Sequence, residues 1–234
     1  MSWVLANLPT IAGHLLAHLL QAVPAIVASF VLAIPIARLA RVARPLRAVL
    51  VTGSSLLYAV PSLALFVILP IILATGIRDP LNVIVALTLY GLALLVPATA
   101  DALDAVDARV LDSATAMGMG RLRCFLTVEL PLAGPAILTG LRVVTVSTIS
   151  LTTVGAVLGV RSLGWLFTDG FQRGITAEIV TGLVATAALA LVLDGLVLAL
   201  GRLCLPWTWK RAGDAGAVPA GACAAASNSR EGKA

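Results

Sequence analysis

Five long apolar segments dominate this sequence and restrict what the chain can fold into. They fall at about residues 19–37, 48–75, 81–100, 136–159 and 179–201. A helix rises 1.5 Å per residue, so about 20 apolar residues cross roughly 30 Å of hydrocarbon. Segments of this length predict an all-α, polytopic membrane protein with about five transmembrane helices.

The composition agrees with a membrane protein. The chain is 60% hydrophobic and 12% charged, with a mean hydropathy of +1.05. Soluble domains average about 45–50% apolar and 25% charged residues. The net charge of +5 does not indicate a nucleic-acid partner, because only 5% of the residues are aromatic and the basic residues lie at the ends of apolar segments. We therefore expect membrane lipid, and no nucleic acid, around this chain.

The second segment, residues 48–75, is too long for one simple crossing. Pro61 and Pro70 each remove a backbone donor that lipid cannot replace. They predict kinks, or a break that lines a cavity.

Residues 1–18 are also apolar, but they contain Pro9, His14 and His18. These residues predict a short interfacial or extracytoplasmic segment ahead of a transmembrane domain at 19–204. The two histidines share a helical face at i and i+4. No third ligand lies nearby, so we expect no metal site.

Basic residues indicate the orientation. Most basic residues lie in three places: after the first segment, in the polar insert between the third and fourth segments, and after the last segment. They are Arg38, Arg41, Arg44, Arg47, Arg109, Arg121, Arg123, Arg202, Lys210 and Arg211. The opposite ends have Arg78, Arg161 and Arg173. The positive-inside rule predicts that the insert and the C-terminus are cytoplasmic and the N-terminus is outside. No Lys or Arg precedes Arg38, so we expect the first apolar segment to stay in the mature protein.

Residues 205–234 differ from the rest. A basic anchor at Trp207–Arg211 precedes a segment rich in Gly, Ala and Ser, which predicts a disordered cytoplasmic tail. The cysteines Cys124, Cys204 and Cys223 have no metal-ligand spacing and are expected to stay reduced.

The insert at residues 101–135 predicts a short exposed helix. The stretch from Asp101 to Met117 favours helix, with Asp107 well placed as the N-cap and the acids Asp101, Asp104 and Asp112 near the helix start. The helix should end at Gly118. Both Gly118 and Gly120 permit the positive φ of a helix C-terminus.

Two further features suit a loop that contacts a partner. Met117 and Met119 offer flexible apolar contacts. Pro131 and Pro135 are expected to mark the start of the fourth membrane helix, where their missing donors are tolerated. An ordinary cytoplasmic loop with a capped helix is the alternative.

Seven positions in this insert match a known spacing. An acidic and two small residues are followed by a glycine, an aliphatic residue and Leu-Pro: Asp112, Ser113, Ala114, Gly118, Val128, Leu130 and Pro131. The spacing resembles the cytoplasmic EAA loop of bacterial ABC import permeases. The family's usual Glu and first Ala are replaced here by Asp and Ser, which keep charge and size. The resemblance implies a coupling helix, with ATPase contacts from Asp112, Ser113, Ala114, Met117, Gly118, Met119, Gly120, Leu130 and Pro131.

A wider resemblance covers roughly residues 50 to 200. It rests on Leu57–Phe66, Thr75-Gly76, Tyr90, Ala116–Gly120, Val128–Leu132 and Gly140–Arg142. These runs are similar to the permease of osmoprotectant importers for glycine betaine, carnitine and choline. The family's Gly-Gly-Leu-Gly after the fourth helix is Arg161–Gly164 here, which leaves docking of the binding protein and the solute open.

The resemblance implies an importer in a bacterial inner membrane, with the type I permease fold. Its partners would be ATPase subunits, an extracytoplasmic solute-binding protein and a second permease chain, identical or related. The sequence contains no G-x-x-x-x-G-K-[ST], so ATP and Mg would be bound by the ATPase and this chain would not be an enzyme. Alternatives are an importer of another small solute, such as an amino acid, methionine or an ergothioneine-like compound, and a channel or scaffold without ATP coupling.

A membrane-embedded enzyme is disfavoured, because the acids of the insert have no histidine beside them. Polar residues within the apolar segments are candidates for the substrate path: Tyr58, Pro61, Ser62, Thr145, Thr148 and Thr152. The three threonines share one helical face, although threonines in membrane helices commonly bond their own backbone. Arg142 and Asp194 are more consistent with a structural ion pair than with a substrate site.

Overall fold

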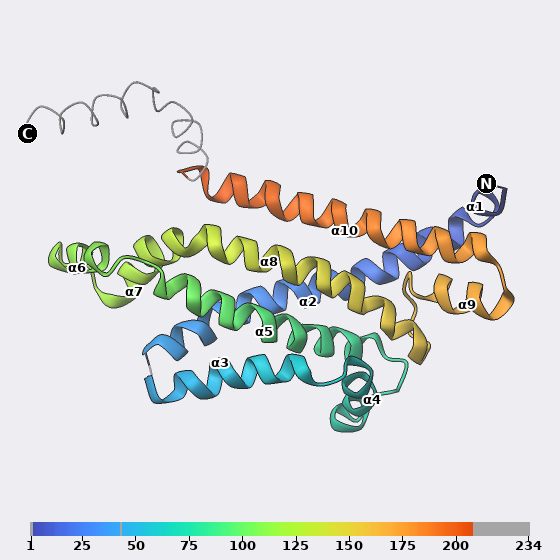
Figure 1. Ribbon diagram of the computed structural model, residues 1–234, viewed down its shortest axis with the longest axis horizontal. Helices are drawn as coiled ribbons and strands as arrows, with labels where there is room; N and C mark the ends of the chain where they lie inside the picture. The colour runs from blue at the N-terminus through green and yellow to red at the C-terminus, as the bar shows by residue number, and fades with distance from the viewer. Residues whose placement is uncertain (1, 43, 208–234) are drawn as a thin grey trace, which may run out of the picture.

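The computed structural model describes residues 2–42 and 44–207. Within these ranges the elements are helices, and the longest run side by side along one axis (Figure 1). In chain order they are α1 (Ser2–Ala6), α2 (Leu8–Val42), α3 (Arg44–Ala59), α4 (Ser62–Leu73), α5 (Pro80–Asp104), α6 (Ala108–Ala116), α7 (Arg121–Cys124), the π-helix η1 (Phe125–Glu129), α8 (Leu130–Thr152), the 3₁₀-helix η2 (Thr153–Leu158), α9 (Trp165–Arg173) and α10 (Thr176–Cys204).

The number of candidate crossings agrees with the sequence. In the described part, α2, α5, the run Arg121–Leu158 and α10 are each long and apolar enough to cross a membrane. The bent pair of α3 and α4 provides a fifth crossing if the two are counted as one. The predicted all-α, polytopic class is therefore confirmed.

The first crossing helix starts earlier than predicted. Helix α2 runs without a break from Leu8 to Val42, with Pro24 and Pro35 inside it, so residues 8–18 are continuous with the first crossing. At 1.5 Å per residue its 35 residues measure about 52 Å, more than the roughly 30 Å of hydrocarbon. The early turns are helical because Ile11 and Leu15 pack on an apolar cluster with Leu163 and Leu166.

The predicted break in the second segment is confirmed. The chain bends by 107° between helices α3 and α4. Pro61, at this bend, is the N-cap of α4 and has an extended ψ of 125°. The carbonyl of Val60 at this break accepts a hydrogen bond of 2.5 Å from the hydroxyl of Tyr90 on α5. Pro70 lies inside α4 and does not interrupt it. The break therefore occurs where a second helix supplies a partner for the exposed backbone.

Helix α5 lies at the centre of the bundle. Its neighbour α2 turns a row of small, fully buried residues toward the interior: Ala22, Ala25, Ser29, Ala33, Ala37 and Ala40. Gly91 of α5 lies so close to Ser29 that a Cβ atom there would be 2.1 Å from the Ser29 hydroxyl. Small residues allow this approach, and Leu95, Val96 and Val144 fill the space beside it.

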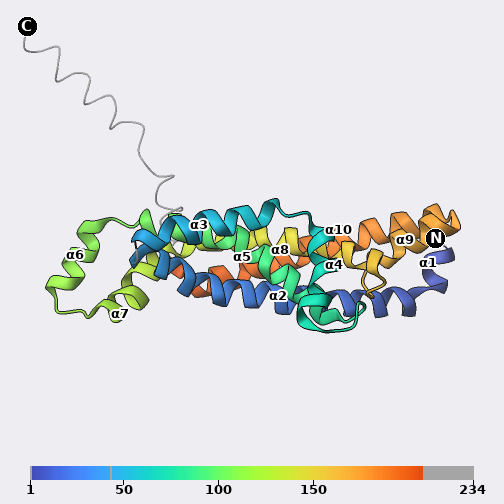
Figure 2. The same cartoon turned by 90° about the horizontal axis from the view of Figure 1, so that it is seen from below.

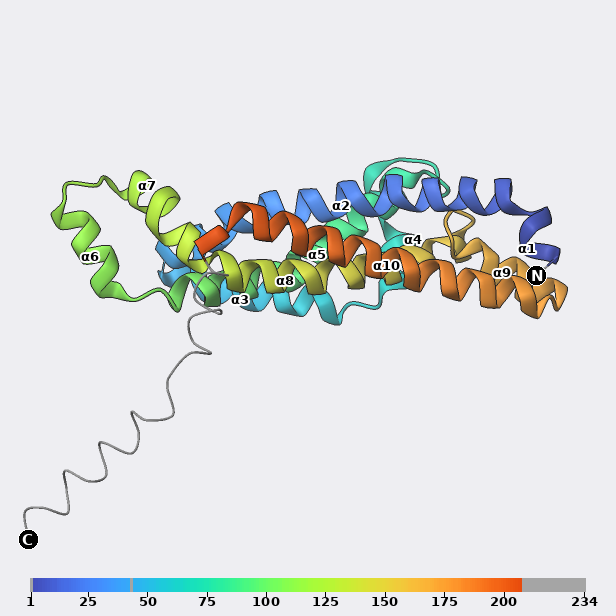
Figure 3. The same cartoon turned by 90° about the horizontal axis from the view of Figure 1, so that it is seen from above.

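The two ends of the bundle differ in what they present. Helices α6 and α7 project beyond the long helices at one end (Figure 2). Helices α1 and α9 lie at the opposite end (Figure 3), and α10 runs along the upper edge of the bundle in Figure 1. The projecting end is where α2, α5 and α10 finish and the run into α8 begins. Of the predicted C-terminal region, Trp207 is described, whereas Lys210, Arg211, Cys223 and the tail lie outside the described residues.

Candidate functional site

Helix α6 begins and ends where the sequence predicted. The Asp107 side chain accepts a hydrogen bond of 2.9 Å from the Arg109 amide, as an N-cap does. After the helix, Gly118 adopts a φ of +82°, and its amide donates to the Thr115 carbonyl at 2.9 Å. Gly120 differs from the prediction. Its φ is −65°, because it starts α7 and does not end α6.

The acids before Asp107 do not belong to this helix. The sequence grouped Asp101 and Asp104 with the coupling helix, but both lie in the last turn of α5. Helix α5 continues that far because Ala102 and Leu103 are buried. The connection between membrane helices is therefore shorter than residues 101–135.

The helical run that leads into the fourth crossing also begins earlier than Pro131. Helix α7, η1 and α8 form one continuous helical run from Arg121. In η1 the backbone has a π-helical turn, so that the Leu130 amide bonds the Phe125 carbonyl. Proline would clash with the carbonyl four residues before it in a regular helix, and a π-turn relieves that clash. Pro131 thus lies within a helical run, in the first turn of α8, and Pro135 lies inside α8.

The candidate coupling residues are exposed to different degrees. Asp112, Ser113, Gly118 and Gly120 are exposed, Met119 is half-buried, and Met117 is 72% exposed. Ala114 is 2% exposed, so its methyl group packs inward and is not offered to a partner. Two apolar side chains that the sequence analysis missed, Val110 and Leu122, are also exposed on this projection. Both were visible as apolar residues in a polar insert.

The three threonines of α8 are inside the chain. Thr145, Thr148 and Thr152 are at most 3% exposed. The hydroxyl of Thr145 donates to the Leu141 carbonyl at 2.8 Å, and that of Thr152 donates to the Thr148 carbonyl at 2.7 Å. The predicted role in lining the path is thus not supported, because packing within the chain covers this face. Bonding to the helix's own backbone, the alternative, is what the structure shows for two of them.

The remaining path candidates gather at the break between α3 and α4. Tyr58 is 48% exposed and lies edge-on to Tyr90, with ring centroids 6.0 Å apart. Pro61 is exposed and Ser62 is half-buried. This break therefore leaves Tyr58 and Ser62 accessible at the surface of the chain.

Arg142 and Asp194 form a two-bond ion pair. The Arg142 Nε lies 2.8 Å from Asp194 Oδ1, and an Arg142 terminal nitrogen lies 2.7 Å from Oδ2. This planar arrangement joins α8 to α10. Both charges are therefore used in holding the helices together.

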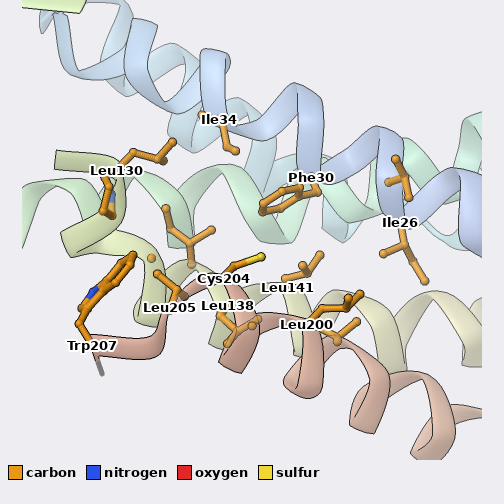
Figure 4. A pocket seen from close by; sticks show the side chains of 16 residues that line it. Ile26, Phe30, Ile34, Leu130, Leu138, Leu141, Leu200, Cys204, Leu205 and Trp207 are labelled. Atoms are coloured by element: carbon orange, nitrogen blue, oxygen red, sulfur yellow. The ribbon is translucent and has the colours of Figure 1, made fainter. Parts of the chain in front are cut away.

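An apolar pocket of about 490 Å³ lies between α2, α8 and α10 (Figure 4). Phe30, Leu138, Leu200 and Trp207 are among the side chains around it, and none of the described residues that line it is charged. Leu130 and Pro131, predicted as coupling residues, also line this pocket. Among the described residues, its lining therefore offers no ion-pair partner for a carboxylate or a cation, although the rings of Phe30 and Trp207 face this region.

The two histidines of α2 are buried within the chain. The ring of His14 stacks on Trp165 at 4.7 Å, and His18 is fully buried. In the described part, no three His, Cys, Asp or Glu side chains gather in a group that could hold a metal ion.

The helical fold and the projecting loop define a class of membrane transport protein. The family described as "Binding-protein-dependent transport system inner membrane component" matches residues 25–208. This chain therefore belongs to that family, and the predicted membership in the permeases is confirmed.

Three bacterial transport permeases are similar to this chain in sequence. The choline transport system permease protein OpuBD of Bacillus subtilis is 30% identical over 197 residues, which cover 84% of this chain and 86% of that protein. The glycine betaine/carnitine/choline permease OpuCD of the same organism is 29% identical, covering 76% of each. The ergothioneine transport permease/binding protein EgtU of Helicobacter pylori is 32% identical over 64% of this chain and 27% of its own length. This chain thus spans about a quarter of EgtU.

Solved structures confirm the fold. An inward-facing MetNI methionine ABC transporter chain matches with a TM-score of 0.73 at 19% identity, covering 83% of this chain and 95% of that chain. An amino acid ABC transporter chain matches with a TM-score of 0.66 at 17% identity, covering 86% and 94%. At these identities the likeness supports the fold alone.

Proposed function

We propose that this chain is the membrane-spanning permease subunit of an ATP-driven importer for quaternary ammonium osmoprotectants. Glycine betaine, choline, carnitine and proline betaine are the candidate solutes. The observation that carries the proposal is that OpuBD and OpuCD, aligned over three quarters or more of this chain, are named for choline, carnitine and glycine betaine. All three compounds carry a trimethylammonium group. The chain supplies half of the path, and a second permease chain supplies the other half.

A related solute is the second candidate. EgtU is named for ergothioneine and is 32% identical to this chain over 151 residues. Ergothioneine also carries a trimethylammonium group, so the cation is common to both candidates. What differs is the rest of the solute, which an extracytoplasmic binding protein would select. In the part of the chain that the structure describes, the apolar pocket has no charged side chain to pair with the rest of the solute, which supports selection by the binding protein.

Reconstitution tests the proposal. The chain is placed in vesicles with its ATPase and solute-binding protein, and uptake of labelled glycine betaine, choline, carnitine, proline and ergothioneine is measured with and without ATP. We expect ATP-dependent uptake of at least one quaternary ammonium compound, and none without the binding protein. Uptake of proline alone would contradict the solute class. Micromolar betaine binding by the isolated chain would contradict the proposal that the binding protein, and not this chain, selects the solute.

Helix α6 is proposed as the coupling helix that contacts the ATPase. Its support is the exposed Met117 and Val110 on an element that projects from the bundle. Gly118→Val should abolish most uptake while the chain stays in the membrane, because a β-branched residue resists the φ of +82° at this turn. No atom lies within 4 Å of an added Cβ there, so backbone strain is the cause. Normal uptake by this variant would remove the coupling role.

The projecting end is proposed to be cytoplasmic and the N-terminus to be outside. The support is that α2 and α10 end beside the projection with basic residues Arg41 and Arg202 in their last turns. A chain without its native cysteines is labelled after Ser113→Cys or Thr168→Cys. The first cysteine should react only when the cytoplasmic side is opened, and the second should react from outside. The reverse pattern would overturn the orientation.

A further inference from the structure

One arginine of α2 contacts both stems of the projecting loop. The Arg41 Nε lies 3.4 Å from an Asp104 carboxylate oxygen, at the point where α5 ends. A terminal nitrogen of the same guanidinium pairs with Glu129, the last residue of η1 before α8. The two acids therefore bracket the loop, and a single side chain from a third helix joins them.

Two neighbouring arginines extend this contact. Arg47, near the start of α3, pairs with the other carboxylate oxygen of Asp104. The guanidinium of Arg38, one turn before Arg41, lies 4.1 Å from the centre of the buried Phe125 ring in η1. The stems of the loop are thus held by α2 and α3 through three arginines, a group that we call the arginine clamp: Arg38, Arg41 and Arg47.

The acids of the clamp have no role in forming their own helices. Asp104 is in the last turn of α5, where the helix dipole disfavours a negative charge. Glu129 is 14% exposed at its side chain, and Phe125 and Ala133, each four residues from it in the same helical run, belong to a buried apolar cluster. A carboxylate in such a place is stabilised by a cation, and an arginine presents five donors that can bridge two carboxylates.

The positive-inside rule gives the arginines a different role, in setting orientation only. That role requires positive charge on one side of the membrane but no particular partner. The observed contacts are specific: Arg41 reaches residues 63 and 88 positions away, one on each side of the projection. Orientation alone does not account for acids placed opposite these arginines.

We infer that the arginine clamp transmits movement of the coupling loop to α2 and α3, with Arg41 as the positioning residue and Asp104 and Glu129 as its partners. The inference rests on the proposed function, in which α6 receives movement from an ATPase. With both stems tied to α2, the loop cannot turn without carrying the helix that packs along α5. Loss of the ties should leave ATP hydrolysis running with less transport.

The test uses Glu129→Gln and Asp104→Asn, which remove one partner each but keep all the basic residues that set orientation. Arg41→Lys keeps the positive charge but cannot bridge both acids as an arginine does. Each variant is reconstituted with the ATPase and binding protein, and ATP hydrolysed per solute taken up is measured. We expect this ratio to rise roughly fivefold, the low end for coupling between sites. The matched control is Asp194→Asn, which breaks an ion pair away from the loop and should leave the ratio unchanged.

The outcomes separate the inference from the proposed function. Absence of ATP-dependent uptake by the unaltered chain would overturn the proposed function. Normal uptake by the unaltered chain with an unchanged ratio in Glu129→Gln and Arg41→Lys would overturn the clamp alone. An equal rise in the Asp194→Asn control would also overturn it, because any loosened ion pair would then suffice. Loss of all the clamp variants from the membrane would show that these pairs serve folding, which contradicts transmission.

Discussion

Helices α5 and α10 are similarly apolar but occupy different positions in the fold. The most apolar windows of the two have mean hydropathies of 2.1 and 2.4. In the structure 56% of that window is buried in α5 and 6% in α10. Hydropathy identifies both as crossings, but it cannot distinguish the central helix from the peripheral one, because lipid and protein interior are equally apolar.

What separates the two helices is how closely their backbones approach a neighbour. Gly91 of α5 is in contact with Ser29 of α2, whereas Gly195 of α10 has open space around it. Large apolar side chains of α10, such as Leu183, Leu191 and Leu203, are exposed on the single chain. The centre of this fold is therefore marked by small residues and not by the most apolar ones.

The largest effect is expected when the same substitution is made in both helices. In Gly91→Ala the new methyl group would lie 2.1 Å from the Ser29 hydroxyl and 2.7 Å from its Cβ, and overpacking of this kind costs about 1–3 kcal/mol. In Gly195→Ala nothing lies within 4 Å, and a helical alanine gains roughly 0.5–1 kcal/mol over glycine. Thermal unfolding in detergent should move in opposite directions for the two variants.

A second substitution checks the cause. Ser29→Gly removes both atoms that the new methyl group would meet, so it should restore part of the stability of Gly91→Ala. If Gly91→Ala and Gly195→Ala unfold at the same temperature, the distinction between the central and the peripheral helix fails.

A smaller loss of stability is expected where α10 is joined to α8. Asp194→Asn removes the charge that pairs with Arg142, but the amide oxygen can still accept a hydrogen bond. The midpoint of thermal unfolding should therefore fall less than in Gly91→Ala. Arg142→Leu combined with Asp194→Leu should recover much of the loss, because no unpaired charge is left in an apolar surrounding. A fall larger than that of Gly91→Ala would show that α10 matters more to the fold than its low burial indicates.

The smallest effect concerns single hydroxyl groups. The Ser29 hydroxyl donates to the Ala25 carbonyl of its own helix at 2.7 Å and reaches the Thr88 carbonyl of α5 at 3.1 Å. Ser29→Ala should cost about 0.6 kcal/mol, the average for interhelical hydrogen bonds in membrane proteins. Within the described part of the chain, the Thr181 hydroxyl of α10 bonds only the Ala177 carbonyl of its own helix, at 2.6 Å, so Thr181→Ala should have no measurable effect on unfolding. If Ser29→Ala and Thr181→Ala lose equal stability, the hydrogen bond between α2 and α5 does not stabilise the fold.

Several features of the candidate site could be predicted from the sequence because they are local. Asp107 caps α6 through a bond to an amide two residues away, and Gly118 adopts a positive φ that few other residues tolerate. The break at Pro61 likewise follows from a missing donor and a fixed φ. Each depends on neighbours within a few residues, which the sequence displays directly.

Other features were mispredicted because they depend on distant packing. The face of Thr145, Thr148 and Thr152 is polar by periodicity, but the structure buries it within the chain. Asp104 was assigned to the coupling helix, whereas the buried Leu103 keeps it in α5. Periodicity shows which residues share a face, but not what covers that face.

The sequence by itself determined the number of apolar crossings, the break at Pro61 and the capped helix of the projecting loop. Hydrophobic length, proline and glycine sterics and local capping are properties of short segments. Only the tertiary structure decided that α5 is central and that the arginines of α2 and α3 hold both stems of the loop. Contacts such as the one between Arg41 and Glu129 join residues 88 positions apart, and no spacing along a single segment encodes them.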